Sequence, residues 1–415
     1  MTTVAAPAVA PRALDWRMWV PCFGMALCSW LAFVDRQVIG SLTPTIIKET
    51  GMSAKDFVDV NSYFFFAYFL ANPIWGSILD SVGLRAGMLM AVGLWTAASM
   101  SHAWMSGFLG FAVARGLLGL GEGATFPGGL RTAVESLPAN LRGRAIALSF
   151  SGGTLGGVAA PLIAVPIALR YGWRAAFLFT GALGITWLII WLLISRPPFL
   201  SGNEQKSKKM AWPNLFERRF WALVSSYALP AIAPGPILTV IPLYLSAAIA
   251  VGGLGVTQAG LKSILWMPPL AWGAGYFFWG WAADKYAAEN RRPVGMFLLL
   301  TVCSLAFGFT TWTSSVMLAM LIISFAAFIG GGFQMVALKV GAYTYPREQA
   351  ALMSGIASGS WALTNYVLLK FLGPLFNAHR YSDAFWLITA LPIVGIAVWL
   401  VLSRNDEGSG DPAGK

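Results

Sequence analysis

Apolar stretches of about 20 residues recur along the whole chain, and they restrict its fold more than any other feature. A helix of this length crosses the hydrocarbon core of a bilayer and pairs its own backbone N–H and C=O groups there. The 415 residues are 57% hydrophobic and 11% charged, with a mean hydropathy of +0.67. We therefore predict an all-α polytopic membrane protein whose partner is the lipid bilayer, with twelve transmembrane helices near residues 18–42, 57–79, 86–104, 107–130, 145–169, 175–195, 219–249, 258–283, 294–313, 315–343, 350–375 and 384–403.

The distribution of positive charge predicts the topology. The chain has 28 Lys and Arg against 17 Asp and Glu. Most of these cations fall in alternate loops between the apolar stretches, as the positive-inside rule describes for cytoplasmic segments. We expect a multi-pass protein of the inner (plasma) membrane with both termini in the cytoplasm. Because the basic residues form no continuous patch, no nucleic-acid partner is expected.

A long polar interruption at residues 196–218 separates six apolar stretches from six others. The two halves resemble each other faintly, because residues 137–152 align with 345–360, and Arg131 aligns with Lys339 at the same offset. Such an internal repeat is typical of transporters that hold a substrate between two lobes. We predict a disordered cytoplasmic tail at 1–17, an N-terminal six-helix lobe at 18–195, a cytoplasmic linker at 196–218, a C-terminal six-helix lobe at 219–403 and a cytoplasmic tail at 404–415.

Charged residues inside apolar stretches mark the candidate site. Arg115 and Glu122 are two helical turns apart and share one face. A charge in hydrocarbon is costly unless it faces a partner or a water-filled cavity, so such residues indicate function first and a helix-locking ion pair second. Asp35 and Glu122 are the acids expected deep within the spans, whereas His102 and His379 are expected near the outer surface. A coupled proton would therefore be carried by Asp35, Glu122 or both, and a static pair such as Asp35 with Arg115 is the alternative.

The buried arginines predict an anionic substrate. A guanidinium can grip a carboxylate with two parallel hydrogen bonds, which makes Arg36 the predicted anion anchor. Arg115 is expected to organise Glu122 and the first helix. Other polar side chains could line the site or could join helices by hydrogen bonds. The full set of candidate substrate-binding residues is Arg36, Arg115, Asn61, Tyr68, Gln334, Ser358, Trp361 and Asn365.

Other classes of protein fit the sequence less well. An enzyme would need a nucleophile with a base, or metal ligands, and the chain has no HExxH or GxSxG motif. Its three cysteines lie in apolar stretches without metal-binding spacing. We expect no enzymatic activity, no cofactor and no metal, and a monomer. A passive facilitator, an exchanger or a sensor built on a transporter fold remains open.

Two short motifs resemble those of a known family. Gly76, Asp80, Gly83 and Arg85 match the loop motif between helices 2 and 3 of the major facilitator superfamily, with Ser81 where Arg is usual. The resemblance implies a gating role for these four residues and for Asp284, which ends the eighth span. A GxxxG surface at Gly152 and Gly156 is expected to allow close contact between helices.

Phe33-Val34-Asp35-Arg36 resembles the Tyr-x-Asp-Arg motif of the anion:cation symporter family. The stretch from Arg115 to Glu122 also resembles this family, and residues 71–198 are most similar to its hexuronate branch, which is related to galactonate transporters. The resemblance implies a proton-coupled symporter that imports a small organic anion by alternating access. It also implies proton coupling by Asp35 and Glu122, and substrate recognition by Arg36.

The predicted substrate is a sugar acid such as a hexuronate, but the chain departs from the family pattern. The usual Tyr of helix 1 is Phe33, and residues 227–245 are rich in Pro and poor in hydrogen-bonding side chains. Each substrate hydroxyl left unpaired in such a site would cost about 1 kcal/mol or more. A less hydroxylated carboxylate, either an aromatic acid or a dicarboxylate, is therefore the alternative substrate.

Overall fold

The computed structural model describes residues 15–138, 140–200, 214–230, 235–286, 292–345 and 347–404, without the side chains of 347–352 and 354. All regular elements within these ranges are helices, as predicted. Most of the predicted tails 1–17 and 404–415, and the middle of the predicted linker 196–218, lie outside the described residues. The lobe boundaries themselves remain a prediction.

The N-terminal half contains eight α-helices and two short 3-10 helices within the described residues. Glycines separate several of them: Gly83 and Gly172 have φ angles of 83° and 85°, which side chains with a Cβ rarely adopt, and each ends one helix and begins the next. The elements are η1 (Trp16–Trp19), α1 (Val20–Ser41), α2 (Thr43–Thr50), α3 (Ala54–Val82), α4 (Leu84–Ser101), η2 (His102–Trp104), α5 (Phe108–Glu122), α6 (Thr125–Ser136), α7 (Arg142–Tyr171) and α8 (Trp173–Ile194).

The C-terminal half also consists of α-helices and short 3-10 helices over its described residues. Several of its helices are interrupted where Pro or Gly cluster in the sequence. The elements are α9 (Arg218–Ala228), α10 (Gly235–Ser246), η3 (Ile249–Val251), α11 (Gln258–Ile264), α12 (Met267–Tyr286), α13 (Val294–Ser304), η4 (Leu305–Trp312), α14 (Val316–Thr344), α15 (Arg347–Asn377) and α16 (Tyr381–Leu402).

The helices follow the twelve predicted spans, but three spans are interrupted by residues outside any helix, and spans 86–104 and 294–313 end as 3-10 helices. Span 107–130 is divided into α5 and α6 at Gly123 and Ala124, span 219–249 into α9 and α10, and span 258–283 into α11 and α12. By length and apolar composition alone, six helical segments within the described residues could cross a membrane: 16–41, 142–171, 173–194, 294–312, 316–344 and 381–402.

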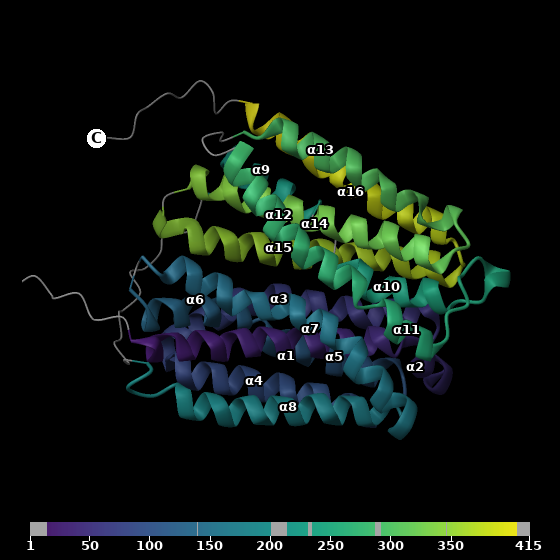
Figure 1. The fold of residues 1–415 in the computed structure, drawn as a ribbon, viewed down its shortest axis with the longest axis horizontal. Coiled ribbons are helices and arrows are strands. Elements are labelled where there is room, and N and C mark those ends of the chain that lie inside the picture. Colours follow the sequence, from purple (N-terminus) through teal and green to yellow (C-terminus); the bar gives the residue numbers. More distant parts are fainter. Residues whose placement is uncertain are drawn as a thin grey trace, which may run out of the picture.

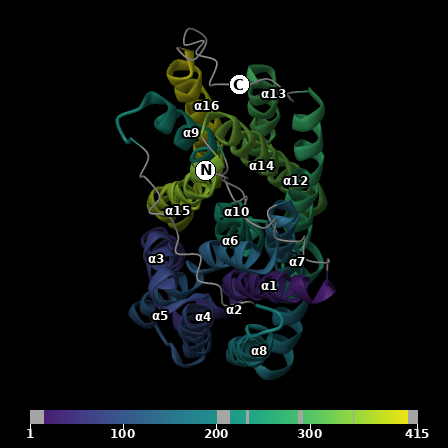
Figure 2. The ribbon, with the colours of Figure 1, turned by 90° about the vertical axis from the view of Figure 1, so that its left-hand side faces the viewer.

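The two halves form two groups of helices that lie one above the other (Figure 1). Viewed along the bundle, α1, α3, α4, α5 and α8 gather in the lower half, and α9 and α12 to α16 in the upper half (Figure 2). Within the halves, α1 packs extensively on α7 and α12 on α14, and between them α3 packs along α15. We call the end where α1 begins and α16 ends the terminal end, and the opposite end, which carries α2 and α11, the distal end.

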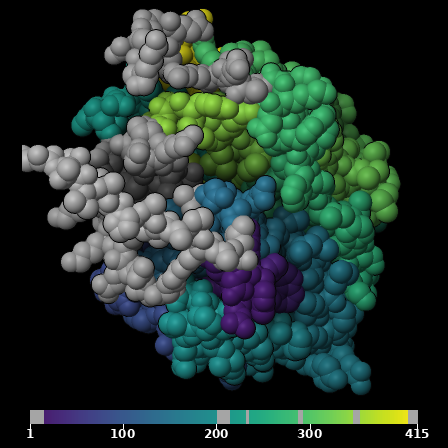
Figure 3. Space-filling view, turned by 60° about the vertical axis from the view of Figure 1, so that its left-hand side comes forward, coloured from purple at the N-terminus to yellow at the C-terminus, as the bar shows by residue number. Residues whose placement is uncertain are grey.

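Polar contacts join the halves at the distal end. Lys370 on α15 forms an ion pair with Asp59 on α3, with 2.9 Å between Nζ and Oδ1, and Lys55 binds the other carboxylate oxygen at 2.6 Å. Gln258 on α11 accepts a hydrogen bond from the Thr45 hydroxyl and donates one to a backbone carbonyl of α1. Seen obliquely from the terminal end, by contrast, the surface is hollowed where the green and the blue halves meet (Figure 3).

Candidate functional site

Arg36 and Glu122 form an ion pair inside the N-terminal half. Arg36 projects from α1, and its Nε donates a hydrogen bond to Glu122 Oε2 at the end of α5. The Glu122 side chain is fully buried, whereas 11% of the Arg36 side chain is exposed. Because Nε is occupied, the two terminal amino groups of the guanidinium remain the groups that can bind a further anion.

Aromatic rings surround the Arg36 guanidinium. Its central carbon lies 4.8 Å from the ring centroid of Phe33, 5.1 Å from that of Phe64 and 4.8 Å from that of Tyr68. Ring faces attract a cation and also exclude water from it. The structure therefore places Tyr68, a predicted site residue, against Arg36, and it adds Phe64, which the sequence analysis did not single out.

Arg115 has a different partner from the one expected. Its Nη2 donates to Asn61 Oδ1 at 2.8 Å, and its guanidinium lies over the Phe64 ring. Its Nε and Nη1 have no hydrogen-bond partner. The direct contact with Glu122 belongs to Arg36, so Arg115 acts on Glu122 only through space. Arg115 instead bonds to α3, which carries Asn61 and packs closely on α5.

Asp35 points away from its neighbour Arg36 and into the N-terminal half. It is 2% exposed, and its Oδ1 accepts a hydrogen bond of 2.7 Å from Ser99 on α4. The Ser99 hydroxyl lies 3.2 Å from that of Thr180 on α8. No hydrogen bond joins Asp35 to Arg115, although both residues are described. Ser99 and Thr180 were missed because a hydroxyl in an apolar helix commonly bonds only to its own backbone.

Gln334 joins two aromatic residues in the C-terminal half. Its Oε1 accepts hydrogen bonds from Trp272 Nε1, at 3.0 Å, and from the Tyr276 hydroxyl. Trp272 stacks on Phe33 of α1, with 5.7 Å between ring centroids and 25° between planes. The structure thus brings Gln334 to the boundary between the halves near Arg36. The i, i+4 spacing of Trp272 and Tyr276 was a usable signal that they share a helix face.

The three candidates on α15 follow its face toward α3. Trp361 packs edge-on against Phe65, with ring centroids 5.6 Å apart. Asn365 is 1% exposed and donates to the Trp361 carbonyl, while Ser358 is half-buried. Trp361 therefore lies in the contact between the two halves, whereas Asn365 lies against Gly235 of α10 in its own half.

The loop-motif residues lie at the terminal end and pair within each half. Asp80 binds Arg131, with 2.8 Å between Oδ1 and Nη1, and Asp284 binds Lys339, with 2.9 Å between Oδ1 and Nζ. The alignment of Arg131 with Lys339 thus corresponds to equivalent ion pairs. The other motif residues make no ion pair: Gly76 has open space around it, Gly83 ends α3, and the Arg85 carbonyl accepts from Trp191.

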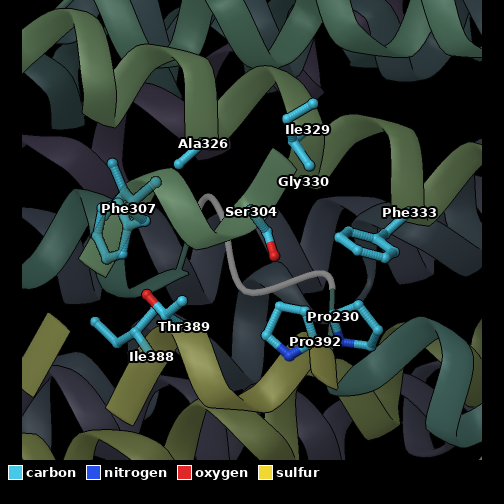
Figure 4. A pocket seen from close by; sticks show the side chains of 11 residues that line it. Pro230, Ser304, Phe307, Ala326, Ile329, Gly330, Phe333, Ile388, Thr389 and Pro392 are labelled. Carbon is cyan, nitrogen blue, oxygen red and sulfur yellow. The ribbon is translucent and has the colours of Figure 1, made fainter. Parts of the chain in front are cut away.

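Two further features lie away from the Arg36 site. His102, at the end of α4, is fully buried and stacks on Phe177. A pocket in the C-terminal half is shown in Figure 4. No charged residue lines it, which makes it unsuitable for an anion. Its lining residues are Pro230, Ile237, Ser304, Phe307, Ala326, Ile329, Gly330, Phe333, Ile388, Thr389 and Pro392.

Comparison with known proteins identifies the family. The model of the Major Facilitator Superfamily matches residues 25–368. The hexuronate transporter of Escherichia coli K12 is 23% identical, over 97% of this chain and 99% of its own. The galacturonate transporter of Dickeya chrysanthemi is 29% identical over 58% of this chain and 74% of its own, and the D-galactonate transporter of Escherichia coli O6:H1 is 23% identical over 90% and 92%.

A solved structure has the same fold. It is a bacterial homologue of the human lysosomal transporter Spinster in an inward-facing, unoccupied conformation, with a TM-score of 0.76 and 17% identity. The alignment covers 94% of this chain and 98% of that one. The predicted resemblance, the two-lobed helical fold and the absence of an enzyme family are confirmed. The chain belongs to the Major Facilitator Superfamily and is a membrane transporter.

Proposed function

We propose that this transporter moves a small organic carboxylate together with a proton, by alternating access to a site between its halves. The names of three relatives support an organic acid, since they are a hexuronate, a galacturonate and a D-galactonate transporter. The observation that carries the proposal is the Arg36–Glu122 pair, in which an arginine side chain that is 11% exposed is held by a fully buried carboxylate.

The buried charges explain why a proton would accompany the anion. Asp35, Arg36, Arg115 and Glu122 lie close enough to interact electrostatically, and their formal charges sum to zero. A bound monocarboxylate would add one uncompensated negative charge in a poorly solvated region, which is costly. One proton taken up by Glu122 or Asp35 would restore neutrality. A stoichiometry of one proton per carboxylate follows.

The geometry gives the proton a specific effect on binding. An ionised Glu122 attracts the Arg36 guanidinium, whereas a protonated Glu122 loses the charge that holds it. Lower pH should therefore release Arg36 to the substrate and tighten carboxylate binding, and higher pH should weaken it. Asp35, held by Ser99, is the second proton carrier. The proposed setting is the inner membrane, with both termini cytoplasmic and the protein acting as a monomer.

The test is uptake into proteoliposomes of a panel of sugar acids, dicarboxylates and aromatic acids, with and without an imposed pH gradient. The gradient should drive accumulation of at least one acid, and uncharged sugars added as competitors should not reduce it. Glu122→Gln and Asp35→Asn should each remove gradient-driven accumulation. Glu49→Gln is the matched control, because this carboxylate pairs with Arg174 in a half-exposed position at the distal end.

Two outcomes would contradict the proposal. Accumulation of uncharged sugars as strong as that of their acids would exclude an anion site at Arg36. Full gradient-driven accumulation in both the Glu122→Gln and the Asp35→Asn variants would exclude them as proton carriers and favour an uncoupled facilitator or exchanger.

A further inference from the structure

Aromatic faces from both halves meet beside the anion anchor. Phe33 of α1 stacks on Trp272 of α12, and Trp272 lies 4.7 Å from Tyr276, measured between ring centroids. The same Phe33 ring lies against the Arg36 guanidinium. A carboxylate bound to Arg36 would therefore carry its adjoining group directly onto the Phe33 and Trp272 rings.

The polar tips of these aromatic residues are already used. The Trp272 N–H and the Tyr276 hydroxyl both donate to Gln334 Oε1. A carbonyl oxygen has two lone pairs, so this oxygen has no remaining capacity for a substrate hydroxyl. Trp272 consequently presents a ring face rather than a free donor toward Phe33.

The amide N–H groups of two predicted site residues donate to the protein's own backbone. Asn61 donates to the Phe57 carbonyl and accepts from Arg115. Asn365 donates to the Trp361 carbonyl, and its oxygen, which accepts no hydrogen bond from the described residues, lies against Gly235. A sugar acid in this site would leave hydroxyl groups unpaired, and each would lose its hydration without replacement.

We infer that the substrate class is a carboxylate attached to a flat aromatic ring, and that Trp272 and Phe33 select this ring by stacking. The inference rests on the proposed organic anion transport and names its substrate class. The carboxylate binds the terminal amino groups of Arg36, and the ring packs against the aromatic cluster that Phe33 and Trp272 form. Trp272 is the specificity-determining residue, because it joins the ring stack to the C-terminal half.

The experiment measures binding to the purified full-length protein by isothermal titration calorimetry. The probes are benzoate, cyclohexanecarboxylate and glucuronate, which share one carboxylate but differ in flatness and hydroxyl content. Benzoate should bind at least 10-fold more tightly than the other two. Arg36→Lys should weaken the binding of every probe that the unaltered protein binds.

Three variants separate stacking from other effects. Trp272→Leu should weaken benzoate at least 10-fold and change cyclohexanecarboxylate less than 2-fold. Trp272→Phe removes the same N–H but keeps a ring, so it should retain most of the benzoate affinity. Trp281→Leu, on the same helix with a half-exposed ring, is the matched control and should change nothing.

The outcomes distinguish this inference from the function on which it rests. If the unaltered protein bound glucuronate more tightly than benzoate, the aromatic substrate class would be overturned. The proposed function would still stand in that case, provided that Arg36→Lys weakened the binding of the carboxylate. Equal losses of benzoate affinity in Trp272→Leu and Trp272→Phe would overturn the stacking role. Failure of every acid in the transport panel would overturn the proposed function itself. The comparison of probes on the unaltered protein decides the substrate class even if a variant does not fold.

Discussion

Arg36 and Arg115 are both arginines in apolar helices, yet their surroundings give them different tasks. Arg36 keeps part of its side chain exposed and has two amino groups beyond its bond to Glu122. Arg115 is 3% exposed and bonds to Asn61 on a neighbouring helix. Arg36 can therefore exchange partners with a substrate, whereas Arg115 fixes α5 against α3 and adds positive potential.

The first prediction concerns the shape of the Arg36 side chain. Arg36→Lys keeps the charge but loses the planar fork that binds a carboxylate with two hydrogen bonds. We expect the affinity for the transported acid to fall at least 10-fold, which corresponds to about 1.4 kcal/mol. Equilibrium binding to the purified variant measures this. Unchanged affinity would show that the anion is held elsewhere.

The second prediction concerns the support of Arg115. Asn61→Ala removes the one side chain that accepts a hydrogen bond from this buried guanidinium, so we expect a loss of about 2 kcal/mol of stability. A lower midpoint of thermal unfolding in detergent would show it. Asn72→Ala is the control, because this buried Asn of the same helix binds only a backbone carbonyl. Equal midpoints for both variants would contradict a supporting role for Asn61.

The four charged residues could be predicted from the sequence, but their pairing could not. A charge within a long apolar stretch is visible without a structure because hydrocarbon makes it costly. The partner of that charge depends on which helices pack together. The i, i+7 spacing placed Arg115 and Glu122 on one face and suggested that they interact, whereas in the structure Glu122 bonds to Arg36 of α1. The sequence analysis did not single out Trp272, because Trp is common in membrane helices and its stacking on Phe33 depends on which helices pack together.

Among the elements, the contact between α1 and α7 depends on small residues. A Cβ added at Gly156 would lie 2.2 Å from the Trp30 carbonyl oxygen, and one added at Gly152 would lie 1.9 Å from that of Ala26. Neither oxygen can move without moving the α1 backbone. The close approach of α1 to α7 therefore holds the helix that carries Asp35 and Arg36 in place.

The third prediction tests this contact. Gly156→Ala should separate the two helices, lower the thermal unfolding midpoint and cost about 1–3 kcal/mol of stability, as overpacking does. Gly143→Ala lies on the same helix where an added Cβ meets nothing, so it should be neutral or slightly stabilising. Thermal unfolding of both purified variants makes the comparison. A Gly156→Ala protein as stable as the Gly143→Ala protein would contradict the role of the glycine contact.

The sequence predicted the positions of the helices well, but it did not predict where they are interrupted. The GxxxG pattern at Gly152 and Gly156 indicated a close helix contact, and the structure contains it. The break between α5 and α6 was missed because Gly123 and Ala124 are as apolar as their neighbours, so hydropathy does not change there. Its consequence is that Glu122 ends a helix, instead of lying in the middle of one.

In the whole molecule, the halves are tied together by polar contacts at the distal end. Asp59, Lys370, Thr45 and Gln258 belong to these contacts. Alternating access requires a second state in which the distal end opens, and these contacts must then break. Interactions of this kind stabilise the present state and set its population.

The fourth prediction is that a permanent link at the distal end blocks transport. Thr45→Cys with Gln258→Cys, joined by a short thiol cross-linker, should reduce uptake to background, and a reducible cross-linker should allow recovery on reduction. The control pair, Glu49→Cys with Arg174→Cys, lies at the same end but within one half, where the two side chains are 3.0 Å apart. Uptake should survive that link. Full uptake by the cross-linked Thr45–Gln258 pair would contradict opening at the distal end.

The Arg36–Glu122 pair also bears on how an unloaded transporter returns across its cycle. After the substrate leaves, a lone guanidinium in this aromatic surrounding would oppose closure of the site around it, because its charge would be desolvated without a partner. In the proposed cycle, Glu122 would take the place of the departed carboxylate, which would allow the empty protein to close and reset. Net transport requires the empty protein to return and would therefore depend on the Glu122 carboxylate. One-for-one exchange of substrate would not, because the protein then returns with substrate bound. Glu122→Gln should accordingly leave a protein that still swaps labelled for unlabelled acid across the membrane but can no longer return empty.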